Sequence, residues 1–156
     1  RDTEDKIFRK LFLNSIQESI SRELFDEELN RIDKIVKSVQ ERLETMNDIK
    51  EQVMFVLDEP FEVNSDDWSD VNTEDGQKYM KNVREKFMSA NNFELNDIEV
   101  IMREELKALD LKPKIGFQIT RVAVTGTKVS PPLFESIYAL GKETTIARLA
   151  ESIEDL

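Results

Sequence analysis

The side chains with the clearest chemistry in this sequence lie in a turn near its C-terminal end. Ser130 and Pro131 stand at the start of an apolar-periodic segment, and a serine followed by a proline is typical of the first residues of a helix. The pattern therefore predicts a helix over about residues 131–140, with Ser130 as its N-cap. Two cations, Arg121 and Lys128, come shortly before this turn. A helix N-terminus with cations beside it is suited to binding phosphate or an exposed nucleobase.

The charge of the chain is distributed unevenly. The whole sequence carries a formal net charge of −11, which argues at first against a nucleic-acid partner. Between residues 112 and 148, however, two acidic residues stand against six basic ones, which are Lys112, Lys114, Arg121, Lys128, Lys142 and Arg148. Because the local field decides where a polyanion docks, this segment is the predicted docking region. A random fluctuation within an acidic protein is the alternative explanation.

The chain contains no cysteine and no histidine. It therefore has neither disulfides nor thiolate zinc sites, and it lacks the commonest general base. The run Asp70-x-Asn72-x-Glu74 is similar to a calcium loop, but Gly76 falls one place too late and Lys81 occupies the position of the bidentate glutamate. We expect no metal site and no catalysis by this chain alone. No apolar run reaches the roughly 18 residues of a membrane-spanning helix.

Apolar periodicity and a low content of glycine and proline predict an all-α fold. Spacing and capping signals predict helices over residues 4–20, 25–46, 48–57, 73–90, 96–109, 131–140 and 142–153. Residues 115–124, ahead of Gly126, fit an extended run or a buried helix, because a short apolar run does not decide the period. The acidic stretch 64–77 is predicted to be a solvated loop between two subdomains, with Trp68 anchored on the core and Thr73 capping the next helix.

Residues 121–149 carry the patterns R-x-A-x-T-G, P-x-L-F-E, L-G-K-E and R-L in this order. This block resembles the C-terminal anticodon-binding region of bacterial glutamyl-tRNA synthetases, and residues 35–46, IVKSVQERLETM, resemble a helix of the same region more weakly. The resemblance implies a two-subdomain, all-helical anticodon-binding cage of the class I synthetase type. It places a stem-contact and first anticodon-binding subdomain at residues 1–64 and a C-terminal anticodon-binding subdomain at residues 65–156.

The resemblance also implies what the chain does. The HIGH-type and KMSKS-type motifs of the catalytic domain are missing, so this chain, which begins at Arg1, is expected to be a non-catalytic part of a longer glutamate–tRNA ligase. ATP and Mg²⁺ would act in that absent catalytic domain, and this part is expected to need no cofactor. The expected partner is glutamate tRNA, with glutamine tRNA left open, and neither DNA nor a membrane. A cytoplasmic monomer is the expected form.

The resemblance assigns tRNA contacts residue by residue. The positions that match the family's anticodon contacts are Arg42, Arg103, Arg121, Ser130, Pro131 and Leu133. Arg42 matches the position associated with telling C from U at the third base, and the loop from Ser130 to Leu133 matches one that reads the middle and third bases. Lys128 and Lys142 are the expected phosphate contacts. An arginine can donate two parallel hydrogen bonds to a base edge, which a lysine cannot.

Other interpretations stay open on the sequence alone. Arg42 and Arg103 are also explained as helix-surface residues in ion pairs one turn away, and Phe134 as part of the core. For the whole chain, one alternative is an acidic helical protein–protein interaction domain, whose mark would be an exposed apolar patch of several hundred Å². Another is the anticodon-binding domain of a different class I synthetase.

Overall fold

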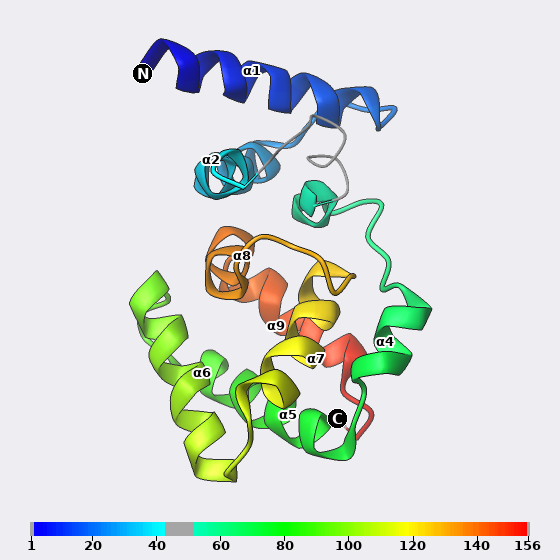
Figure 1. Cartoon of the computed structure of the whole chain (residues 1–156), viewed down its shortest axis with the longest axis vertical. Coiled ribbons are helices and arrows are strands. Elements are labelled where there is room, and N and C mark those ends of the chain that lie inside the picture. Colours follow the sequence, from blue (N-terminus) through cyan, green and yellow to red (C-terminus); the bar gives the residue numbers. More distant parts are fainter. Residues whose placement is uncertain (1, 43–51, 156) are drawn as a thin grey trace.

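The structure is a computed structural model that describes residues 2–42 and 52–155 (Figure 1). All regular elements in these residues are helical, which confirms the predicted fold class. In chain order they are α1 (Asp2–Glu18), α2 (Asp26–Gln40), the 3-10 turn η1 (Met54–Val56), α4 (Ser65–Val71), α5 (Glu74–Ser89), α6 (Leu95–Leu109), α7 (Pro113–Thr125), α8 (Leu133–Leu140) and α9 (Lys142–Ser152). Within the described ranges, no helix is both long and apolar enough to cross a membrane.

Helix α7 lies at the centre of the group α4–α9. It contacts every other helix of that group and also η1. Its buried residues are Gly116, Ile119, Thr120, Val122, Ala123, Val124 and Thr125. Pro113 occupies its first turn, and Gly126, with a left-handed φ of 89°, ends it. From the sequence, residues 115–124 fitted either a strand or a buried helix, because a short apolar run does not decide the period. The structure shows that they form a helix.

The acidic stretch 64–77 is helical, and the prediction of a solvated loop is wrong. It holds α4 and the start of α5, because two side chains cap these helices. Asn64 accepts a hydrogen bond from the Asp67 N–H (2.9 Å), and the Thr73 hydroxyl caps α5 in the same way (3.0 Å). The predicted cap at Thr73 and the contact of Trp68 with the core are both confirmed.

Helix α8 begins later than the sequence suggested. Its N-cap is Pro132, without a side-chain hydrogen bond, and its first residue is Leu133. The predicted N-cap at Ser130 is therefore wrong. The Ser130 hydroxyl instead binds the Arg121 guanidinium and the Pro131 carbonyl, so it is not available to the first turn of α8.

The other helix ends shift by small amounts. Helix α6 begins at Leu95, with a capping box formed by Glu94 and Asp97 in place of the predicted one at Asn96. Helix α2 ends at Gln40. Residues 41 and 42 form a turn, so the helix predicted to reach residue 46 ends earlier than expected. Residues 43–46 of that prediction and residues 48–51 of the helix predicted at 48–57 lie outside the described residues.

Buried charged side chains join the two ends of the molecule. Figure 1 shows α1, α2 and η1 at one end and α4–α9 at the other, with α2 packed against α8. Arg31 of α2 donates to the Val56 carbonyl and to the Thr144 hydroxyl of α9, both at 2.9 Å. Arg148 of α9 donates to the Phe55 carbonyl at 2.7 Å. The segment around η1 is thus held between α2 and α9. A subdomain boundary at residues 64 and 65 stays a prediction.

Candidate nucleic-acid interface

The loop between α7 and α8 is folded around the guanidinium group of Arg121. Nη1 of Arg121 donates to the Pro131 carbonyl at 2.8 Å and to the Ser130 hydroxyl, which itself donates to the Pro131 carbonyl at 2.8 Å. These contacts fix the half-buried arginine at the N-terminal end of α8. Each of these acceptors is neutral, so the hydrogen bonds leave the arginine charge uncompensated.

Burial and two charges of opposite sign act on Arg121. Burial lowers the pKa of Arg121 below its ordinary value, the charge of Arg42 lowers it further, and the charge of Glu135 acts in the opposite direction. Arg42 is exposed and follows directly after the C-cap of α2. A half-buried arginine whose hydrogen-bond partners are neutral can still donate to an anion or to the electron-rich edge of a base.

Arg103 approaches the start of α8 from α6. Its guanidinium carbon lies 5.3 Å from the ring centroid of Phe134 and 5.9 Å from that of Phe117, within cation–π range. It also forms an ion pair with Glu99 at 2.8 Å, which confirms the predicted ion pair one turn away. Phe134 packs half-buried against the core, as expected. The Arg103 side chain remains 52% exposed beside the first turn of α8.

Three of the predicted contact residues are buried rather than displayed. Ser130 is 9% exposed, Leu133 is 5% exposed and belongs to the main core, and Pro131 is buried as well. Of the three, Ser130 and Pro131 accept hydrogen bonds from Arg121. In the same loop Val129 faces solvent and is 65% exposed. The structure therefore brings Arg121, Ser130 and Pro131 together and places Arg103 beside Phe134 in the first turn of α8, while the side chains of Ser130, Pro131 and Leu133 are buried.

The two lysines expected to contact phosphate are both engaged within the protein. Lys128 Nζ forms an ion pair with Asp70 at 2.6 Å. Lys142 Nζ donates to the Ala90 carbonyl, just past the end of α5, at 2.7 Å. Arg148, another of the six basic residues in this segment, is buried. The ion pair offsets the charge of Lys128 and burial withdraws Arg148 from an RNA backbone, whereas Lys142 donates to a neutral carbonyl and keeps its charge. The phosphate contacts of the lysines stay a prediction.

The sequence did not predict that Asn64 and Asp67 support the loop between α7 and α8. Asn64 is the N-cap of α4, and Asp67 lies in its first turn. The Asn64 N–H donates to the Gly126 carbonyl at 2.8 Å, and the Asp67 carboxylate accepts from the Lys128 N–H at 3.0 Å. The latter contact joins residues 61 positions apart in the chain. No local pattern signals such a contact, and the prediction of a solvated loop at 64–77 drew attention away from it.

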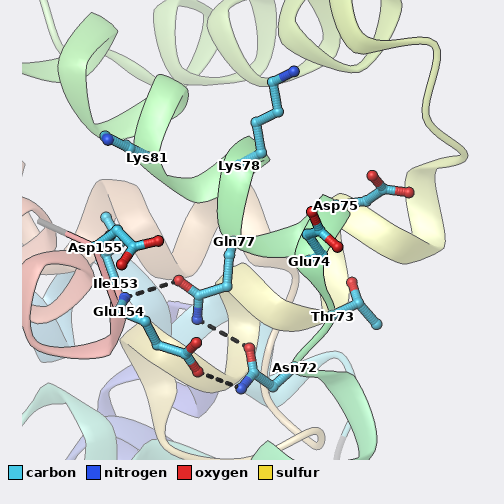
Figure 2. A pocket seen from close by; sticks show the side chains of 10 residues that line it. All are labelled: Asn72, Thr73, Glu74, Asp75, Gln77, Lys78, Lys81, Ile153, Glu154 and Asp155. Carbon is cyan, nitrogen blue, oxygen red and sulfur yellow. Dashed lines mark hydrogen bonds between the residues drawn. The ribbon is translucent and has the colours of Figure 1, made fainter.

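A groove of about 560 Å³ lies between the turn from α4 to α5 and the C-terminal residues (Figure 2). Gln77 donates to Asn72 at 2.9 Å and accepts from the Glu154 N–H at 3.0 Å, while Asn72 donates to the Glu154 carboxylate at 2.8 Å. The groove contains none of the predicted contact residues, so we regard it as a structural junction. In the part of the chain that the structure describes, no group of three or more His, Cys, Asp or Glu could hold a metal ion.

Residues 10–153 match a protein-family model described as the anticodon binding domain. The chain belongs to this family. The anticodon-binding domain is 33% identical over 116 residues to the glutamate–tRNA ligase of Symbiobacterium thermophilum, a match that covers 74% of this chain and 24% of that protein. It is 30% identical over 132 residues to the glutamate–tRNA ligase of Cutibacterium acnes, covering 83% of this chain and 27% of that protein.

The fold of the anticodon-binding domain also occurs in a larger solved structure. The crystal structure of a glutamate tRNA ligase from Elizabethkingia meningosepticum in complex with its amino acid superposes with a TM-score of 0.75 and 20% sequence identity. The match covers 97% of this chain and 29% of that one. The chain thus spans about a quarter of the length of the ligases it matches. These findings confirm the resemblance drawn from the sequence and do not favour a protein–protein interaction domain.

Proposed function

We propose that this chain is the anticodon-binding part of a glutamate–tRNA ligase and that it binds the anticodon loop of glutamate tRNA. Membership of the anticodon-binding family and the similarity to two glutamate–tRNA ligases support this proposal. Aminoacylation with ATP and Mg²⁺ would take place in a catalytic domain outside this sequence. We place the whole enzyme in the cytoplasm and expect this part to act as a monomer, without a DNA or membrane partner.

The way the loop holds Arg121 is the observation that carries the proposal. Arg121 is half-buried and hydrogen-bonded to the neutral oxygen atoms of Ser130 and Pro131. An unstacked loop base offers ring nitrogens and carbonyl oxygens that can accept from its guanidinium group. A fixed arginine loses little conformational entropy when a base binds, which favours selective recognition over loose charge attraction.

Arg42 and Arg103, which are both exposed, have separate proposed roles. Arg42 is the proposed reader of the third base, and through that base it would decide whether glutamine tRNA is also accepted. Arg103, steadied by Glu99 and the Phe134 ring, is the proposed second contact to the loop. Under this proposal Ser130 and Pro131 act mainly by holding Arg121 in place, and Leu133 acts by anchoring the start of α8 in the core.

Binding of an RNA hairpin tests the proposal. The probes are a hairpin with the anticodon loop of glutamate tRNA and hairpins with each anticodon base replaced in turn, measured by fluorescence anisotropy at low salt. Arg121→Ala is expected to weaken binding of the first hairpin by about 1–3 kcal/mol, or roughly 5- to 150-fold, and to reduce the preference among hairpins. Arg9→Ala on α1 is the matched control, since it removes the same charge from an exposed surface ion pair. Equal losses for both variants, or equal binding of all hairpins, would contradict base recognition.

A further inference from the structure

The loop between α7 and α8 is held from two sides. On its inner side, Arg121 binds Ser130 and Pro131. On its outer side, the Asp67 carboxylate accepts from the Lys128 N–H at 3.0 Å. Each support acts on different residues, so the outer one adds a constraint that the arginine does not provide.

The side chain of Lys128 reinforces the outer contact. Its ammonium group forms an ion pair with Asp70 at 2.6 Å, one turn after Asp67 on the same helix. Burial of Trp68 and Val71 against the core anchors the helix that carries both carboxylates. Helix α4 also packs on α7, so it is a rigid base for the loop. The contact from Asp67 is a hydrogen bond from a backbone N–H to a charged acceptor, which is stronger than one between neutral groups.

We propose that Asp67 is a positioning residue for the loop between α7 and α8, which holds the base-reading Arg121. In the same proposal Lys128 is a brace, meaning that its ion pair with Asp70 fixes the loop to α4, and it does not contact phosphate. The inference rests on the proposed function, because it assigns a role within the same RNA-binding site. Asp67 fixes the backbone at Lys128, two residues before Ser130, and thereby sets where Ser130 and Pro131 hold the Arg121 guanidinium. Helix α4, in an acidic stretch far from the loop in sequence, thus contributes to anticodon recognition without touching RNA.

Variants of the two carboxylates separate a brace from a phosphate contact. Asp67→Ala is expected to weaken binding of the glutamate hairpin about tenfold and to reduce the preference for its anticodon, whereas Asp67→Asn keeps an acceptor oxygen and should restore most of both. Asp66→Ala is the matched control, because Asp66 is an exposed carboxylate on the same helix. Asp70→Ala distinguishes the two roles of Lys128 by its effect on affinity for the glutamate hairpin. The affinity falls or stays unchanged if Lys128 is a brace, and it rises if the released ammonium group contacts phosphate.

The dependence of binding on salt provides a second test of whether Lys128 contacts phosphate. Each single-strand phosphate contact adds roughly −0.7 to the slope of log affinity against log salt concentration. Lys128→Ala should leave this slope unchanged, because the ammonium group that it removes pairs with Asp70 and not with a phosphate. A slope shallower by about 0.7, together with tighter binding by Asp70→Ala, would overturn the assignment of Lys128.

Hydrogen exchange of the loop amides separates failure of this inference from failure of the proposed function. Asp67→Ala should speed exchange at residues 127–131 while the global unfolding temperature stays close to that of Asp66→Ala. Unchanged loop exchange, or faster exchange with full hairpin affinity and preference, would overturn the positioning role. If the unaltered chain bound no hairpin, the proposed function would fail, and the role of Asp67 in RNA binding would fall with it whatever the exchange showed.

Discussion

Substitution of the buried Arg148 by methionine should be among the most destabilising single changes in this chain. Its Nη1 donates to the Phe55 and Val124 carbonyls at 2.7 and 2.8 Å, and its Nη2 donates to the Leu57 carbonyl at 3.0 Å. The guanidinium carbon also lies 3.6 Å from the ring centroid of Phe61. One side chain thus connects α9 with α7 and with the segment around η1.

The magnitude follows from these contacts. Each hydrogen bond from a charged donor contributes about 1.5–3 kcal/mol, and methionine fills a similar length but leaves three buried carbonyls unpaired. Part of the loss is recovered, because burial of the guanidinium is itself unfavourable. That burial, with a smaller effect from the charge of Arg31, lowers the pKa of Arg148 to about 10. We expect a net loss of about 3–5 kcal/mol, as when one partner of a buried charged group is removed.

Urea unfolding followed by circular dichroism measures this loss. Arg9→Met is the control, because Arg9 pairs with Asp33 on the surface and both side chains are more than 40% exposed. An exposed pair of this kind contributes at most about 1 kcal/mol. If Arg148→Met lost no more stability than Arg9→Met, the three carbonyl contacts would not be the connection that the structure indicates.

Two further predictions concern a glycine at the loop and the acidic side of the pH range. Gly126→Ala should lower stability by about 1–3 kcal/mol in thermal unfolding, because φ is 89° and the new Cβ would lie 2.5 Å from the Glu62 carbonyl oxygen. Gly141→Ala would place its Cβ in open space, but its φ of 86° and ψ of 166° lie in a region that only glycine adopts readily, so this variant reports backbone strain without a clash. Burial raises the pKa of Glu28, but hydrogen bonds from Arg22 and two backbone N–H groups outweigh it, and the pKa falls below its ordinary value of 4.5. The stability from Glu28 is therefore complete above about pH 4.5 and is lost as the pH falls through the lower pKa of the folded protein. Glu28→Gln should flatten this part of the pH–stability curve, and an unchanged curve would contradict the assignment.

Sequence reasoning succeeded where a helix keeps one polar and one apolar face. Helix α5 is an example, since the cap at Thr73 and the inward residues Tyr79 and Phe87 all follow local rules. It left α7 open because residues 115–124 are a short apolar run whose spacing fits a strand as well as a helix. It also misjudged α4, because it anticipated the contact of Trp68 with the core but not the Asn64 cap at which this helix begins.

For the site, residue types and near neighbours were predictable, while distant contacts were not. The sequence indicated Arg121 by its place before the turn at Ser130 and by the family resemblance, and its partners come only nine and ten positions later. The polar turn at Ser130 suggested a helix cap, yet its hydroxyl serves that arginine instead. The contact from Asp67 to Lys128 depends on how α4 packs on α7, and only the tertiary structure supplies this information.

The internal contacts of the basic residues set the salt dependence of RNA binding. Of the six bases between residues 112 and 148, the structure engages Lys128, Lys142 and Arg148 within the protein. Lys112, Lys114 and Arg121 of that segment, together with Arg42 and Arg103, then remain for contacts with phosphates or nucleobases. At roughly −0.7 for each contact, the slope of log affinity against log salt should be no steeper than about −3.5. A slope steeper than about −4 would contradict this assignment of the basic residues, whereas a slope in the expected range would mean that recognition rests on a few cationic side chains in an otherwise acidic protein.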